Sequence, residues 1–364
     1  MRVSNVSFYS YYGSTVSLLQ IIEETKAMKI KLSLAFSLLA LSSFHVNANS
    51  NVAESRIQYQ LTAVPIVQVE KKQLIAPGVW LIPDPYINYV PNIGIIEGKD
   101  AILVIDTGMG MQNGQHVYQV AKEIAKNRKI YLTTTHFHPE HQFGAAEFKD
   151  ATYIINQKQE HELKDKGANY LQMFRAFGQI EKKALEKVVI RNADKTYSKR
   201  TVVDLGGRLV TLQEMPAHTR GDQIIYDQTS GTVFMGDLYE KNFYPIMPDA
   251  DAKGSEWIKV IQQTIEMQPK IVVPGHGKLS TIQDLQEFKQ HMLRVKALVK
   301  QHIALGLNQD QIIQTISPTI YREYPDWNNR VFLPFQIANF YAELTQQAIV
   351  LPSLVKELQS DPTQ

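Results

Sequence analysis

The chain has 364 residues, of which 44% are hydrophobic and 20% are charged, and its formal net charge at pH 7 is +2. This is a globular composition with enough residues for a sizeable core, without the basic stripe of a nucleic-acid binder or the acidic block of a solvated tail. The sequence contains no cysteine. Disulfides and thiolate metal ligands are therefore excluded, and any metal must bind imidazole or carboxylate groups.

The N-terminal 48 residues predict export from the cytoplasm. Two lysines follow a second methionine, Met28, and an apolar run of 13 residues extends from Leu32 to Phe44. A small-residue exit ending at Ala48 follows, and the run is too short for a comfortable membrane span. We expect residues 1–48 to be an upstream extension plus a secretory signal peptide cleaved near Ala48. The mature chain would be periplasmic or secreted without a stable membrane anchor; an N-terminal anchor or a buried helix is the alternative.

The body of the chain alternates short β-branched runs with helical stretches. Strands are predicted at 78–82, 92–98, 101–108, 129–135, 152–156, 208–215, 223–227, 232–238 and 270–277. Helices are predicted at 114–126, 157–177, 255–266 and 281–306, with a further terminal helix in the tail after Ser317. Two successive sets of strands and helices indicate two packed sheets with helices outside.

Three histidines and a glutamate follow the strand predicted at 129–135: His136, His138, Glu140 and His141. On an extended backbone, side chains at positions i and i+2 leave on the same side, so His136 and His138 can bind one cation. Pro139 stiffens the turn before the second pair. A core strand could not satisfy so many polar rings without a metal, although an incidental polar surface loop is the alternative.

Three more ligand-type residues follow predicted strands in the second half: His218, Asp237 and His276. If these strand ends converge on one edge of a sandwich, seven ligand side chains meet there. Seven are too many for one tetrahedral zinc, and they suit two metals that share a bridging ligand.

The motifs HFHPEH, AHTRGD, FMGDL and PGHG, together with VIDTG at 104–108, resemble the metallo-β-lactamase superfamily. The resemblance implies an α+β fold, an αββα sandwich of two mixed β-sheets with helices on the outer faces. It places this domain at residues 49–310, with a C-terminal helical extension at 311–364 packing on the same domain.

The resemblance also implies the role of each site residue. His136, His138 and His218 would hold a first metal; Glu140, His141 and His276 would hold a second; Asp237 would bridge them, and Asp106 would support the site. The metal expected is zinc, two ions per chain, and iron is possible. The family's pattern has aspartate where this chain has Glu140, whose carboxylate lies about 1 Å further from the backbone. Either the loop compensates, or the second ion binds weakly, or Glu140 acts mainly as a proton carrier.

The predicted function is that of a secreted zinc-dependent hydrolase acting on a small molecule. A metal-bound hydroxide would attack the carbonyl of an ester, lactone, thioester or β-lactam amide, and Glu140 or Asp237 would transfer the proton. The alternatives are a mononuclear iron oxidoreductase and a non-catalytic periplasmic metal-binding accessory protein. The remaining histidines, such as His291, are expected to be solvated or satisfied side chains, and Lys241 to be a solvated loop lysine. The sequence indicates neither the substrate nor the oligomeric state.

Overall fold

The computed structural model describes residues 58–247 and 249–353. These residues all belong to one unit, Ser55–Gln364. The predicted signal peptide lies outside the described residues. Within them, no helix combines the length and the apolar character needed to cross a membrane.

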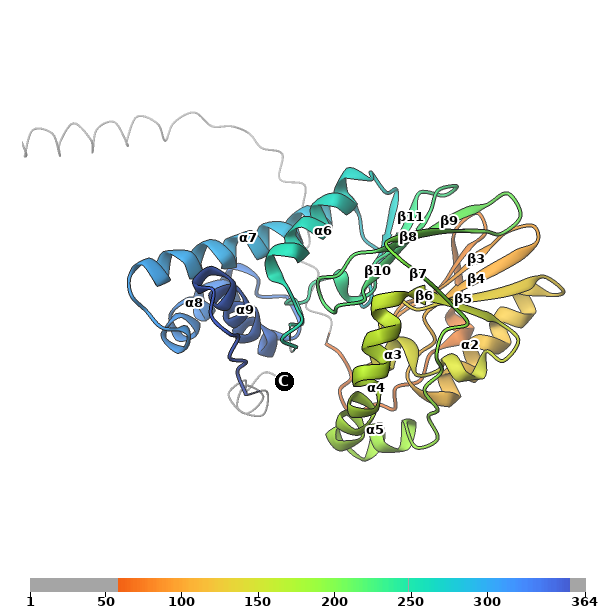
Figure 1. The fold of residues 1–364 in the computed structure, drawn as a ribbon, viewed down its shortest axis with the longest axis horizontal. Helices are drawn as coiled ribbons and strands as arrows, with labels where there is room; N and C mark the ends of the chain where they lie inside the picture. Colours follow the sequence, from red (N-terminus) through yellow and green to blue (C-terminus); the bar gives the residue numbers. More distant parts are fainter. Residues whose placement is uncertain (1–57, 248, 354–364) are drawn as a thin grey trace, which may run out of the picture. The chain divides into compact units, whose positions relative to one another are not determined.

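The first sheet has seven strands in sequential order. They are β1 (Gln73–Ala76), β2 (Val79–Ile82), β3 (Ile93–Glu97), β4 (Ala101–Ile105), β5 (Lys129–Thr133), β6 (Thr152–Asn156) and β7 (Lys195–Tyr197). Figure 1 labels five of them, β3 to β7. The neighbours from β1 to β4 pair antiparallel, and those from β4 to β7 pair parallel. This sheet is therefore mixed.

The second sheet has five strands in the order β12-β11-β10-β9-β8. They are β8 (Arg200–Asp204), β9 (Leu209–Glu214), β10 (Gln223–Asp227), β11 (Thr232–Phe234) and β12 (Ile271–Val273). Only β11 and β12 pair parallel; the other neighbours are antiparallel. Since β9, β11 and β12 consequently run in the same direction, their carboxyl ends lie at one edge of this sheet.

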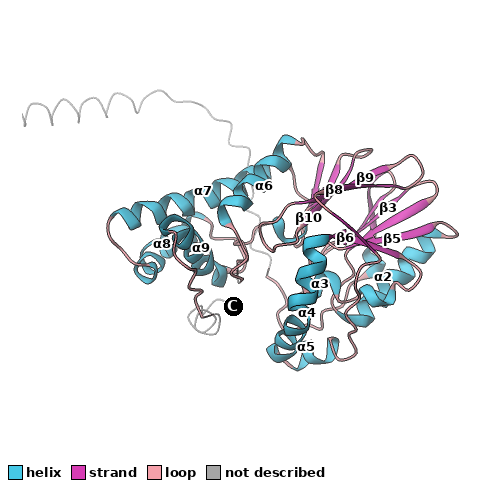
Figure 2. Cartoon of the chain, in the orientation of Figure 1, coloured by secondary structure: helices cyan, strands magenta, loops and turns pink. Residues whose placement is uncertain are grey.

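Eight α-helices in the described part connect or cover the strands (Figure 2). They are α2 (Gly110–Ala125), α3 (Pro139–Gln142), α4 (Gln157–Phe177), α5 (Gln179–Ala184), α6 (Gly254–Glu266), α7 (Ile282–Ala304), α8 (Gln309–Glu323) and α9 (Leu333–Thr345). Short 3₁₀ turns accompany them, including η3 (Gly236–Leu238) directly after β11.

Strand β4 shows why the layers stack. All five of its residues are buried, and successive side chains of a strand point to opposite faces. Ala101, Leu103 and Ile105 join a cluster with residues of the second sheet. Ile102 and Val104 join the cluster that contains the buried face of α2. A strand with two apolar faces needs a layer on each side, as in other sheets covered on both faces.

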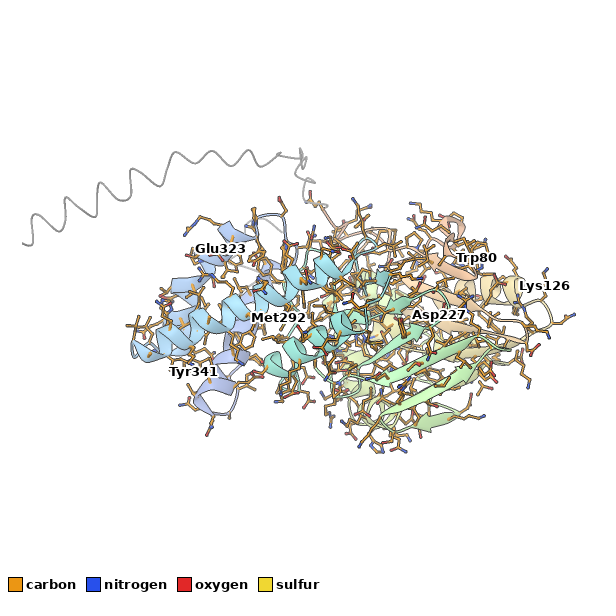
Figure 3. The ribbon with its side chains drawn as sticks, turned by 90° about the horizontal axis from the view of Figure 1, so that it is seen from above. Trp80, Lys126, Asp227, Met292, Glu323 and Tyr341 are labelled. Carbon is orange, nitrogen blue, oxygen red and sulfur yellow. The ribbon has the colours of Figure 1, made fainter. Side chains whose placement is uncertain are left out.

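The second sheet repeats this arrangement. Val233 of β11 and Val272 of β12 lie in a cluster with the apolar residues of α6, α7, α8 and α9. Figure 3 shows Met292 of α7 and Tyr341 of α9 among these helices. The predicted αββα sandwich of two mixed sheets is thus confirmed. The predicted domain limits at residues 48 and 310 stay a prediction.

Candidate metal centre

The segment after β5 carries four of the seven predicted ligands. His138 is extended and forms the N-cap of the four-residue helix α3, with Pro139 at its first position, where a missing N–H costs nothing. Glu140 and His141 lie in the helix itself, so they leave the backbone in a different direction from His136 and His138. All four side chains are buried.

The other three predicted ligands follow the parallel strand ends of the second sheet. His218 lies in the loop after β9, Asp237 lies in η3 after β11, and His276 lies in the loop after β12. The two sheets are joined here, because the N–H of Gln223 donates to the carbonyl of Thr135 over 2.9 Å. The structure thus brings the ligands predicted from distant segments to one edge of the sandwich.

A first group consists of His136, His138, His218 and Asp237, whose ligand atoms all lie within 4.8 Å of one another. Nδ1 of His138 lies 3.1 Å from Nε2 of His218. Oδ2 of Asp237 lies 3.6 Å from Nε2 of His136 and 4.0 Å from Nε2 of His218. Three imidazoles and one carboxylate therefore converge, as in a tetrahedral metal cage.

A second group consists of Glu140, His141, His276 and Asp237, within the same 4.8 Å limit. Here the other carboxylate oxygen faces the histidines: Oδ1 of Asp237 lies 3.1 Å from Nε2 of His141 and 3.8 Å from Nε2 of His276. Asp237 therefore offers one oxygen to each group. Glu140 reaches the second group despite its longer side chain.

The donor set fits a pair of cations. Nε2 of His136 and Oε2 of Glu140 are buried and have no hydrogen-bond partner among the described residues. Buried polar atoms almost always have a partner, so buried atoms that converge without one indicate that these residues bind a ligand. Neutral imidazoles and carboxylates without thiolates suit zinc, iron or manganese.

The electrostatics of the first group favour the protonation states that metal binding needs. Burial lowers the pKa of His136 and His138 well below its usual value, and the neighbouring histidines lower it further. Burial alone would raise the pKa of Asp237, but His141 and His136 hold it well below its usual value. Neutral imidazoles and an ionised carboxylate are the forms that coordinate a metal.

Asp106, predicted as a supporting residue, lies behind His141. Its Oδ2 is 2.9 Å from Nδ1 of His141, and its Oδ1 accepts the N–H of Thr135 over 2.7 Å. Asp106 has φ +67°, a left-handed backbone conformation that aspartate tolerates better than most residues. Burial would lower the pKa of His141, but Asp237 and Asp106 raise it well above its usual value. The two carboxylates therefore favour a positive charge at the ring of His141.

Three residues near the site were not predicted from the sequence. Asp84 follows β2, and its Oδ2 lies 3.7 Å from Nδ1 of His276. Tyr170 of α4 stacks its ring on His138, with centroids 5.1 Å apart. Glu240 is buried with one orphan oxygen, and burial together with Asp237 raises its pKa well above its usual value. Only Asp84 had a readable signal, an aspartate two residues after the end of a strand.

Lys241, expected from the sequence to be a solvated loop lysine, instead forms an ion pair with Asp284 of α7. His291 of α7 is fully buried, and its Nε2 lies 3.0 Å from Oε1 of Gln336. It belongs to the helical layer and not to the metal groups.

Known proteins match this chain in sequence and in fold. The model of the metallo-beta-lactamase superfamily matches residues 88–276. The human acyl-coenzyme A thioesterase MBLAC2 is 25% identical over 214 residues, which cover 51% of this chain and 72% of that protein, and the bovine protein of the same name is 24% identical over 213 residues.

Solved structures show the same fold at low identity. A metallo-beta-lactamase family protein from Thermus thermophilus is similar with a TM-score of 0.55 and 16% identity, over 75% of this chain and 95% of that chain. A metallo-beta-lactamase from Pontibacter korlensis has a TM-score of 0.50 and 18% identity, over 61% of this chain and 98% of that chain. With its matched motifs on the expected loops, the chain belongs to the metallo-beta-lactamase superfamily and is a metal-dependent hydrolase.

Proposed function

We propose that this hydrolase uses two zinc ions, one in each ligand group, to cleave the acyl bond of a small thioester or ester. The observation that carries the proposal is the placement of Asp237, whose two oxygens face separate groups of buried ligands. His136, His138 and His218 would hold the first ion, Glu140, His141 and His276 the second, and Asp237 both. A dinuclear site with a shared carboxylate is a common arrangement for hydrolysis.

Zinc ions in these positions would supply Lewis acidity, which makes water nucleophilic near pH 7 and offsets the negative charge that develops on a carbonyl oxygen. The chain's own residues hold the geometry. Glu140, whose pKa is raised by burial, provides a carboxylate oxygen that can take up the proton of the reacting water and return it to the leaving group. Asp237, whose pKa is held low, would serve to hold the ions. Asp106 fixes the ring of His141, and the carbonyl of Ile246, 2.8 Å from Nδ1, fixes that of His218.

The thioester comes first among the carbonyl classes because the human and bovine relatives are named acyl-coenzyme A thioesterases. The chemistry of the site itself is compatible with all four classes considered, since each has an electrophilic carbonyl carbon. A lactone and a β-lactam therefore remain part of the test.

The proposal also includes export, because the pattern from Met28 to Ala48 is that of a secretory signal peptide. A periplasmic or secreted enzyme would meet its substrate outside the cytoplasm. N-terminal sequencing of the chain recovered from a bacterial periplasm should give a start close to residue 49. Recovery of an uncleaved chain from the cytoplasm would argue against export.

The decisive experiment combines metal analysis with a substrate panel. Protein purified without added metal is analysed for zinc, iron and manganese, then assayed with an acyl-coenzyme A, an aryl ester, a lactone and a β-lactam. We expect two zinc ions per chain and turnover of the thioester or the ester that stops on chelation and returns with zinc. One iron per chain with oxygen-dependent turnover would select the oxidoreductase. Two bound ions without turnover of any of the four would select the accessory protein.

A further inference from the structure

The loop between β2 and β3 is tied to the loop that carries His276. Oδ2 of Asp84 accepts the N–H of Gly277 over 2.8 Å. Nδ2 of Asn92 donates to the carbonyls of Gly277 and Pro274 over 2.8 and 3.1 Å, and the N–H of Asn92 donates to the carbonyl of Gly275 over 2.8 Å. These four bonds join segments that lie far apart in the sequence and fix the backbone on both sides of His276.

The ring of His276 lies between two carboxylates. Its Nε2 is 3.8 Å from Oδ1 of Asp237, and its Nδ1 is 3.7 Å from Oδ2 of Asp84. The side chain of Asp84 has 0% exposure, so its charge is screened little by solvent. The distance of 3.7 Å exceeds that of a hydrogen bond, so the contact between Asp84 and His276 is an electrostatic one.

Tyr59 holds Asp84 from the other side. Its hydroxyl donates to Oδ2 of Asp84, and its ring packs edge-on against Phe243, with centroids 5.0 Å apart. The ring of Phe243 in turn lies 6.3 Å from that of His276. The carboxylate is therefore fixed by a phenol, a backbone amide and the packing of aromatic rings.

The two ligand groups differ in what lies behind their histidines. In the first group, neutral oxygens face a ring nitrogen of two of the three histidines: Oγ1 of Thr135 is 3.1 Å from His136, and the carbonyl of Ile246 is 2.8 Å from His218. In the second group, carboxylates take this place: Asp106 behind His141 and Asp84 behind His276. A carboxylate behind a histidine raises its basicity as a metal ligand more than a neutral oxygen does.

We propose that Asp84 is a positioning residue that strengthens cation binding at the second group through His276, and that Tyr59 holds Asp84 in place. The inference depends on the ligand assignment made above for the proposed function. It also offers a physical reason why the second group can tolerate Glu140: two buried carboxylates behind its histidines compensate for a ligand of unusual length.

A purely structural role for Asp84 is the competing explanation, because its Oδ1 also accepts the N–H of Tyr86 over 2.6 Å. Loss of a structural bond would destabilise the whole edge and weaken both cation sites together. Loss of a positioning contact would weaken the second site alone. The two explanations therefore differ in how the affinities of the two sites change.

The test is a cobalt(II) titration of the full chain, freed of metal, in which visible absorption and bound cobalt per chain report each ion. For Asp84→Asn we expect a loss of roughly 10- to 100-fold in affinity for the second cobalt and an unchanged first affinity. Asp227→Asn is the matched control, since Asp227, labelled in Figure 3, also has 0% side-chain exposure but pairs with Arg208. Asp227 lies opposite Thr232, the first residue of β11, whereas Asp237 follows the other end of that strand. The control should lower thermal stability and leave both cobalt affinities unchanged.

Tyr59→Phe is a milder variant that removes only the hydroxyl bonded to Asp84. It should weaken the second cobalt by several-fold, and it keeps the test valid if Asp84→Asn fails to fold. Equal loss of both affinities in either variant, or no loss at all, would overturn the inference. Binding of a single cobalt by the unaltered chain would also overturn it. Because the readout is metal binding, it stands apart from the turnover assays that test the proposed function.

Discussion

A β-carbon at Gly275 would lie 2.1 Å from Oδ1 of Asp237, the oxygen that faces His141 and His276. Glycines flank His276 on both sides, and glycine commonly allows a tight turn through a positive φ. That reason applies to Gly277, whose φ is +88°, but Gly275 has no positive φ. Gly275 is instead required because the carboxylate of Asp237 approaches its backbone more closely than any side chain would permit.

Gly275→Ala should therefore displace Asp237 and weaken both ions. A shift of about 1 Å at a reacting centre can cost on the order of 100-fold in rate, and we expect a loss of that order together with a lower metal content. Gly306→Ala is the control, because Gly306 has φ +80° but nothing within 4 Å of an added β-carbon. It should cost about 1 kcal/mol of stability and leave metal content unchanged. A fully metallated, fully active Gly275→Ala variant would show that Asp237 does not bridge.

His138→Ala should abolish metal content and hydrolysis together. The variant removes Nδ1, which lies 3.1 Å from Nε2 of His218, and leaves the first group with two imidazoles. His161→Ala, at an exposed position on α4, should leave both properties unchanged. Zinc per chain is measured by elemental analysis beside turnover of the best acyl substrate. Retention of full zinc and full turnover by His138→Ala would remove the basis of the ligand assignment.

The sequence predicts the parts of the fold whose burial is uniform. β4 is a continuous apolar run and β10 has an apolar centre, and their predicted bounds agree with the structure to within three residues because both faces are covered. β8 is not predicted, because three of its five residues are exposed and its pattern mixes charged and β-branched residues. The start of α8 is not predicted either. Asn308 and Gln311 form a capping box there, but Pro318 inside the helix suggests an interruption of the helical pattern.

The site is predictable to the extent that ligands occur in short motifs. His136 and His138 are recognisable because they stand at positions i and i+2, so their side chains leave an extended backbone on the same side and can bind one cation. Asp84 follows a strand, which is a readable signal, but its link to the site cannot be predicted, because its partner Gly277 is 193 residues away and only the folded sheets bring the two together. The sequence places Tyr170 in a polar helix, and its contact with His138 depends on how α4 packs against α3.

Lys166 of α4 neutralises a cluster of carboxylates beside the site. Its Nζ lies 2.7 Å from Oδ2 of Asp249 and 3.2 Å from Oε1 of Glu162, and it also pairs with Asp251. Asp249 further accepts the hydroxyl of Tyr170, whose ring stacks on His138. Lys166 therefore joins α4 to the loop before α6.

Lys166→Met should lower the free energy of unfolding by about 1–3 kcal/mol, because removing one partner leaves partly buried carboxylates unpaired. Urea unfolding monitored by circular dichroism measures the change. Lys164→Met is the matched control: Lys164 lies on the same helix and pairs with Glu160, but its side chain is 55% exposed, so the loss should stay below about 0.5 kcal/mol. Equal effects of the two substitutions would show that the cluster adds no stability.

The buried ring of His291, which lies outside the metal groups, should make the free energy of unfolding depend on pH. Burial lowers its pKa to about 4 in the folded chain, and Gln336 opposes part of that shift. In the unfolded chain the pKa returns to about 6.5. Well above this value the ring is neutral in both states and has no effect. As the pH falls from about 6.5 towards 4, only the unfolded chain takes up the proton, so stability is lost through this window.

The loss between pH 7 and pH 5 that is due to His291 should be about 2 kcal/mol. His291→Phe keeps an aromatic ring beside Trp327 and Tyr324, whose centroids lie 4.6 Å away, and removes the titrating group. Its unfolding free energy should therefore change by about 2 kcal/mol less over this range than that of the unaltered chain. The metal-free forms of both chains are compared, so the ligand histidines contribute equally and cancel in the difference. His161→Phe, at an exposed position, should follow the unaltered chain, and a His291→Phe variant with the same pH slope would show that the buried ring does not remain neutral.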